Sequence, residues 1–140
     1  MPFAAAELQA FANGFPVALL HAITGLLIWA AVFSLHARLS PGKPVDQVRD
    51  GNGAAAVALG GSMVCLALPL GVALAASPST AEAAFWGIAI SVVQLLTLRL
   101  TDMAMRGLPE RVREGDITAA VLLNCARLAV AILLASAVAG

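Results

Sequence analysis

Long apolar stretches separated by short polar ones dominate the pattern along the chain. Each of four stretches is long enough for a transmembrane helix, which needs about 20 mostly apolar residues. They run from about Pro16 to Leu39, Gly53 to Ala75, Ser79 to Thr101 and Ile117 to Ala139. Each stretch is apolar on every face of the helix that it would form. None of them shows the period-two alternation that is typical of a strand. The pattern predicts an all-α integral membrane four-helix bundle, with residues 1–140 forming a single membrane domain.

The first 15 residues contain no Lys or Arg. The positively charged start of a cleaved signal peptide is therefore missing. This stretch is expected either to lie at the membrane interface or to form a loose tail. The residues that favour the interface are Phe3, Leu8, Phe11 and Phe15.

The composition supports a membrane protein and excludes several other classes. Of the 140 residues, 61% are hydrophobic and 11% are charged, whereas about 25% is usual for a soluble domain. The formal net charge is zero and tyrosine is absent, so a surface for nucleic acid is not expected. Two cysteines cannot form a disulfide framework. We therefore expect the lipid bilayer as a partner, and no nucleic acid.

The basic residues lie on one side of the predicted membrane. All but Arg127 fall in or beside the loops that join spans one and two and spans three and four: Arg38, Lys43, Arg49, Arg99, Arg106, Arg111 and Arg113. The positive-inside rule places these loops in the cytoplasm. A multi-pass protein of the plasma membrane is expected, with both termini periplasmic or extracellular.

The two halves of the chain resemble each other at an offset of 64 residues. Residues 48–59 align with residues 112–123, and seven of the twelve pairs are identical. This predicts two duplicated transmembrane hairpins, about 16–75 and 79–139, in parallel orientation. Gly51 and Gly115 are expected to end a short surface turn with positive φ. Asn52 and Asp116 are expected to cap the spans that follow.

Short motifs in the loops and in the helices after them carry a family resemblance. They are Asp50-Gly51-Asn52, Ala54-Ala55-Ala56, Leu59-Gly60-Gly61 and Ala67-Leu68-Pro69-Leu70 in the first half, and Glu114-Gly115-Asp116 and Ala119-Ala120 in the second. The chain resembles bacterial membrane proteins of the "domain of unknown function 350" family over residues 16–139. The resemblance implies a multipass protein of the bacterial inner membrane built from duplicated hairpins, and it implies no catalytic residues. Asn124 and Arg127 depart from the apolar fourth helix of that family.

Small residues in the second span allow a neighbouring helix to approach closely. Ala56 and Gly60 are four residues apart, as are Gly61 and Cys65. We expect these four positions to serve helix packing within the chain, with an interface between copies as the alternative.

Residues that could carry chemistry do not come together in the sequence. The two cysteines lie in different spans, and the two histidines lie about 22 Å apart along one helix. No metal site, cofactor or catalytic residue is therefore expected. No Asp or Glu lies in the middle of a span, which argues against proton-coupled transport. Asp102 is expected to pair with Arg99, three residues before it.

Arg127 is the exception in the apolar spans. It lies about ten residues and about 15 Å into the fourth span, where a charge costs about 2.5–3.5 kcal/mol. Asn124 lies one turn away, and Gln94 and Ser91 should lie at a comparable depth. These four residues form a predicted intramembrane polar patch. With no carboxylate of this chain expected at that depth, Arg127 needs nearby amides and carbonyls, a carboxylate from a partner chain, or an anion in a wet cavity.

Two functions remain open at this point. The first is a non-enzymatic accessory or scaffold subunit of the bacterial inner membrane, which assembles as a homo-oligomer or with another membrane protein. The alternative is a small channel or transporter, with an anion or solute path at Arg127, Asn124 and Gln94. A membrane enzyme is a third and less favoured class. A hydrated cavity that reaches Arg127 would favour transport.

Overall fold

The chain folds into helices joined by short turns. The computed structural model describes residues 2–140, and within that range the helices are α1 Pro2–Leu39, α2 Pro44–Arg49, α3 Gly53–Ala76, α4 Thr80–Ala104, α5 Leu108–Arg113 and α6 Ile117–Ala139. Of the helices described, α1, α3, α4 and α6 are long and apolar enough to cross a membrane. The all-α class is confirmed, and each of the four predicted spans corresponds to one of these long apolar helices. Each half of the chain runs long helix, short helix, long helix, while the parallel hairpin repeat stays a prediction.

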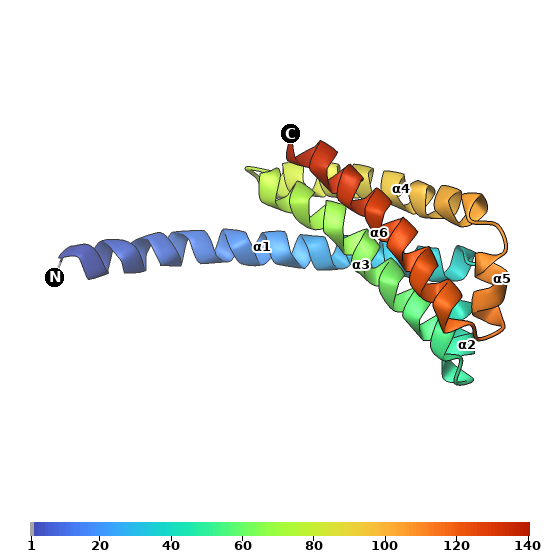
Figure 1. Ribbon diagram of the computed structural model, residues 1–140. Helices are drawn as coiled ribbons and strands as arrows, with labels where there is room; N and C mark the ends of the chain where they lie inside the picture. The colour runs from blue at the N-terminus through green and yellow to red at the C-terminus, as the bar shows by residue number, and fades with distance from the viewer. Residues whose placement is uncertain (1) are drawn as a thin grey trace.

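The long helices form a wedge rather than a parallel bundle. α3 and α6 lie side by side and make the most extensive helix contact, and α4 packs on α1 and α3 (Figure 1). Near the C-terminus α4 and α6 lie close together, and they diverge toward the end where α2 and α5 lie (Figure 1). The short helices therefore occupy the open end of the wedge.

Two apolar clusters fill the wedge at different levels. At the open end, Val112 of α5 is buried with side chains of α3 and α6: Ala54, Ala58, Ala119, Ala120 and Leu123. Deeper in the bundle, a second cluster joins α3, α4 and α6 and is covered by aromatic side chains of α1: Cys65, Leu66, Leu98 and Ala131, with Trp29 and Phe33. Val112 therefore gives α5 a packing role.

α1 begins earlier than the sequence predicts. The expected start near Pro16 is wrong, because α1 is a continuous helix of 38 residues that runs through this proline. Pro16 removes one backbone donor, while the Ala, Leu, Glu and Gln residues before it are strong helix formers. A loose tail is therefore wrong for residues 3–15, which continue the helix α1, whereas a location at the membrane interface stays a prediction.

The caps of α3 and α6 are formed by the predicted residues. Asn52 Oδ1 accepts a hydrogen bond from the Ala55 amide at 3.0 Å, and Asp116 Oδ1 accepts one from the Ala119 amide at 3.1 Å. Before each cap lies a glycine with positive φ, at 90° for Gly51 and 91° for Gly115. At the opposite end of the bundle, the Ser79 hydroxyl caps α4 by accepting from the Glu82 amide at 3.2 Å.

The two equivalent caps differ in what else they bind. Asn52 Nδ2 donates to the carbonyls of Val112 and Arg113, at 3.1 and 3.0 Å, and so ties the start of α3 to the end of α5. Asp116 instead accepts from Arg111 Nε at 2.9 Å. The Ala119 amide, followed by the Arg111 guanidinium, holds the pKa of the Asp116 carboxyl below its usual range. The side-chain amide of Asn52 and the carboxylate of Asp116 are therefore not interchangeable.

Exchanging the two cap types should have unequal effects. Asn52→Asp keeps the capping oxygen but turns the donor that faces two carbonyls into an acceptor. At about 0.5–1.5 kcal/mol per hydrogen bond, the loss should be about 1–3 kcal/mol of unfolding free energy. Asp116→Asn keeps its cap and should lose less. Unfolding by sodium dodecyl sulfate in mixed micelles measures both, and equal losses would contradict the tie between α3 and α5.

Candidate functional site

A buried ion pair lies where α4 and α6 begin to diverge. Arg127 Nε donates to Asp102 Oδ1 and Arg127 Nη2 to Asp102 Oδ2, each at 2.8 Å. The side chains are 7% and 18% exposed, respectively. This is the bidentate geometry in which a guanidinium binds a carboxylate most strongly.

The third nitrogen of Arg127 extends the site to α3. Nη1 donates to the Ser62 hydroxyl at 3.0 Å and to the Ala58 carbonyl at 3.3 Å. The Ser62 hydroxyl in turn donates to the same carbonyl at 3.0 Å. One guanidinium therefore connects α3, α4 and α6, and each of its nitrogens has a partner inside the chain.

This pairing corrects two expectations from the sequence. A carboxylate of the chain does reach Arg127, although none was expected at its depth. Asp102 does not form its ion pair with Arg99, whose Nη2 donates instead to the His36 carbonyl at 3.1 Å. Helical side chains lean toward the N-terminus of their own helix. Arg127 therefore leans toward the open end of the wedge and Asp102 toward the closed end, so they meet although their α-carbons differ in depth.

The other members of the predicted polar patch make separate contacts. Asn124 Nδ2 donates to the Val57 carbonyl at 2.6 Å, and a Cβ at Gly61 would overlap the Asn124 amide. Gln94 is fully buried and its side-chain oxygen accepts from Thr97 Oγ1 at 3.3 Å. Among the described residues, no hydrogen bond joins any of these side chains to Arg127. The patch is therefore not one cluster.

Buried polar atoms remain without protein partners in this region. Ser91 Oγ, Gln94 Nε2 and Asn124 Oδ1 have none among the residues that the structure describes. Ser91 and Gln94 lie on the buried face of α4, three residues apart. Ser91 and Gln94 are therefore buried polar groups of α4, and neither forms a hydrogen bond with Arg127 in the part of the chain that the structure describes.

The small residues of α3 divide into two pairs. Cys65 is buried, and Gly61 gives room to Asn124 of α6. Ala56 is exposed, and a Cβ at Gly60 would meet nothing within 4 Å. Gly61 and Cys65 therefore serve packing inside the chain as expected, whereas the expectation is wrong for Ala56 and Gly60.

A small cavity reaches the ion pair from the open end of the wedge. Its volume is about 70 Å³, and its polar lining comes from His36, Ser40, Gln47, Ser62, Asp102, Arg113 and Arg127. Since about 10–15 Å³ of such space is enough for one water molecule, the cavity has room for a few. On its other side the bundle is filled by Leu66, Leu98 and Ala131. The ion pair is therefore accessible to a polar space from one end.

Comparisons with known proteins give a family but no activity. A family model described as Domain of Unknown Function (DUF350) matches residues 10–138. The chain belongs to this family. Searches among curated proteins and among solved structures give no match. The DUF350 assignment confirms the resemblance inferred from the loop motifs, and it covers the caps, the ion pair and the cavity together.

The arrangement of the site favours a structural role for the ion pair. Among the described residues, no group of three or more His, Cys, Asp or Glu side chains could hold a metal ion. The ion pair carries a fixed positive and a fixed negative charge, each bound by the other. It can hold three helices in register and orient the few water molecules that the cavity admits.

Breaking the pair from one side should destabilise the bundle strongly. Arg127→Leu leaves the Asp102 carboxylate buried without a partner, and the expected loss is about 3–5 kcal/mol of unfolding free energy. Arg127→Leu/Asp102→Leu should recover most of this, because no charge is then stranded. Unfolding in mixed micelles measures each variant, with exposed Arg49→Leu as the control. A double variant no more stable than Arg127→Leu would contradict the pairing.

Proposed function

We propose that this DUF350 protein is a non-enzymatic, multipass membrane subunit that assembles with itself or with a second membrane protein. The observation that carries the proposal is the first half of α1. Every side chain from residue 3 to residue 20 is exposed, and this segment extends far beyond the other helices (Figure 1). Outside the membrane, an exposed apolar segment of this size is typical of an interaction surface.

The length of the exposed segment follows from a contact at the closed end of the wedge. His21 Nδ1 lies 3.3 Å from Thr80 Oγ1, at the first residue of α4. The bundle therefore begins near His21, and the helix before it is about 28 Å long. The remainder of α1, from His21 to Leu39, is already sufficient to cross the hydrocarbon core.

The exposed segment has an apolar stripe suited to packing against another helix. Leu8, Phe11, Phe15 and Leu19 follow each other at spacings of three and four residues, which places them on one face. Phe11 and Phe15 stack with ring centroids 5.2 Å apart. Polar side chains lie on the opposite face, at Gln9 and Asn13. Such anchors are typical of a helix that binds a groove or a second helix.

The charge of Arg127 gives no support to the assembly proposal. Because Asp102 supplies its carboxylate, a partner chain is not needed to compensate its charge. The proposal therefore rests on α1. The first form of the proposal is a homo-oligomer, in which α1 binds further copies of this chain. In the second form α1 binds another membrane protein.

The alternative function is a channel or transporter, and one observation favours it. The cavity at the open end reaches Arg127 and Asp102. A path through the bundle would also have to pass the buried side chains Leu66, Leu98 and Ala131, which fill the space beyond the ion pair. Asn124 and Gln94 do not line this cavity. The assembly proposal is therefore the better supported of the two.

The location and orientation belong to the same proposal. We propose that the protein lies in the bacterial inner membrane. The end of the molecule that carries α2 and α5 then faces the cytoplasm, and both termini are periplasmic. The basic residues of the two loops support this orientation through the positive-inside rule. The duplication of parallel hairpins is proposed from the match of residues 48–59 with residues 112–123.

The assembly proposal predicts a difference between the two faces of α1. Phe11→Gln/Phe15→Gln should shift the purified protein toward monomers in mild detergent, as measured by light scattering after size exclusion. Gln9→Ala/Asn13→Ala, on the opposite face, should leave the mass unchanged. Thermal stability of the monomeric bundle should be equal in both variants, because this segment lies outside it. If a second membrane protein copurifies instead, its loss from the Phe variant supports that form of the proposal.

Monomeric wild-type protein that retains no partner would overturn the assembly proposal. So would oligomers, or a retained partner, that persist unchanged in the variant with both phenylalanines replaced.

The orientation can be tested with single cysteines. Ala81→Cys, at the start of α4, should react in intact cells with a membrane-impermeant maleimide. Asp46→Cys in α2 and Glu110→Cys in α5 should react only after permeabilisation, since both original side chains are exposed at the opposite end. The wild-type chain, with Cys65 and Cys125 in α3 and α6, gives the background. Labelling in the reverse pattern would overturn the orientation, and labelling of α2 but not α5 would overturn the parallel hairpins.

A further inference from the structure

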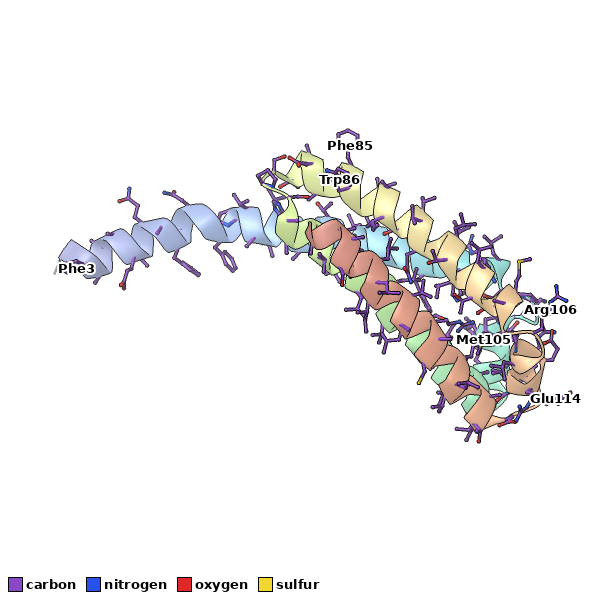
Figure 2. All side chains as sticks on the ribbon, turned by 45° about the horizontal axis from the view of Figure 1, so that its top comes forward. Phe3, Phe85, Trp86, Met105, Arg106 and Glu114 are labelled. Atoms are coloured by element: carbon purple, nitrogen blue, oxygen red, sulfur yellow. The ribbon has the colours of Figure 1, made fainter. Side chains whose placement is uncertain are left out.

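A second site lies outside the wedge, where α4 turns into α5. A groove of about 610 Å³ is lined by Arg99 and Met103 near the end of α4, by Arg106 in the turn that follows, and by Arg113 of α5. Figure 2 shows Arg106 extending from this turn at the end of the molecule. Three guanidinium groups therefore face one open space.

The charges in this groove are not balanced by its carboxylates. Asp102 is held by Arg127, and Glu110 lies 3.7 Å from Arg113. Arg99 donates to a neutral carbonyl. Among the described residues, no hydrogen bond or ion pair is formed by Arg106. The groove thus keeps two guanidinium groups without a carboxylate partner.

An apolar stripe leads from the groove along the outer face of α4. Its side chains follow at spacings of three and four residues, and each is more than half exposed: Phe85, Ile88, Val92, Leu96, Leu100 and Met103. Arg99 belongs to the same helical face, between Leu96 and Met103. From Phe85 to Met103 the stripe is about 27 Å long, close to the thickness of a hydrocarbon core. Phe85 projects outward at the far end of α4 (Figure 2).

We propose that this groove binds the phosphate of an anionic phospholipid whose acyl chains lie along the stripe of α4. The forked donors of arginine match phosphate oxygens in a bidentate manner. Basic pockets at the ends of transmembrane helices bind anionic headgroups in this way. A free phosphate would use the same arginines, but the adjoining apolar stripe commits the site to a lipid.

The test uses the purified full-length protein in mild detergent with two lipids, phosphatidylglycerol and phosphatidylcholine. Binding is measured by native mass spectrometry across a lipid titration. Wild-type protein should prefer phosphatidylglycerol, and Arg106→Gln should weaken that binding about fivefold, the effect of one basic residue near an anionic headgroup. Arg106→Gln should fold normally, because this side chain holds no other residue. Arg106→Lys should keep part of the preference.

Arg49→Gln is the control for an arginine at the same end of the molecule. Arg49 is an exposed arginine of α2 that lies outside the groove. It lies 3.6 Å from Asp46, in the way that Arg113 of α5 lies near Glu110. Its replacement should leave phosphatidylglycerol binding unchanged. An equal loss in Arg49→Gln and Arg106→Gln would mean a diffuse surface charge and would overturn the site. Wild-type protein without a preference would do the same.

Inorganic phosphate distinguishes the two sources of the anion. Under the proposal, millimolar phosphate should not displace phosphatidylglycerol. Displacement at concentrations equal to those of the lipid would identify a soluble anion as the ligand and would overturn the lipid assignment. Neither outcome depends on the oligomeric state, so this test is independent of the assembly proposal.

Discussion

A guanidinium held inside the bundle is the constraint on which the arrangement of α3, α4 and α6 depends. Placing an unpaired charge in an apolar surrounding costs far more free energy than leaving that charge in water. Arg127 therefore has to keep the Asp102 carboxylate and the Ser62 hydroxyl within hydrogen-bond distance. Sliding one of these helices by a single turn would move its partner atom by about 5.4 Å. The ion pair thus fixes a register that apolar side chains alone would leave adjustable.

The wedge shape explains why polar groups gather at one end of the molecule. Where α4 and α6 diverge, the space is filled by Val112 and the rest of α5, whose helix ends need hydrogen-bond partners. Asn52 supplies two of them. The cavity and the groove at Arg106 lie at this end and both reach Asp102 of the ion pair, whereas the closed end buries small apolar residues such as Ala73 and Ala83.

The sequence predicted what depends on neighbouring residues and missed what depends on helix arrangement. The four spans, the caps at Asn52 and Asp116 and the glycines before them follow from local composition and spacing. The partner of Arg127 does not, because depth counted along a helix places only the α-carbons. The side chains of Arg127 and Asp102 lean toward each other from their two helices and so meet. A carboxylate near the end of α4 was the one available signal, and its nearness to Arg99 in sequence obscured it.

α1 presents the opposite situation, with more apolar surface than the bundle uses. From His21 onward it packs through Trp29, whose indole nitrogen donates to the Met63 carbonyl at 3.1 Å, and through Phe33. The stripe of Leu8, Phe11, Phe15 and Leu19 continues along the face that carries these aromatics, since each step is three or four residues. A face that packs against α3 inside the bundle therefore extends beyond it without a helix to cover it. The first half of α1 therefore keeps this apolar face exposed in the structure, and this is the observation on which the assembly proposal rests.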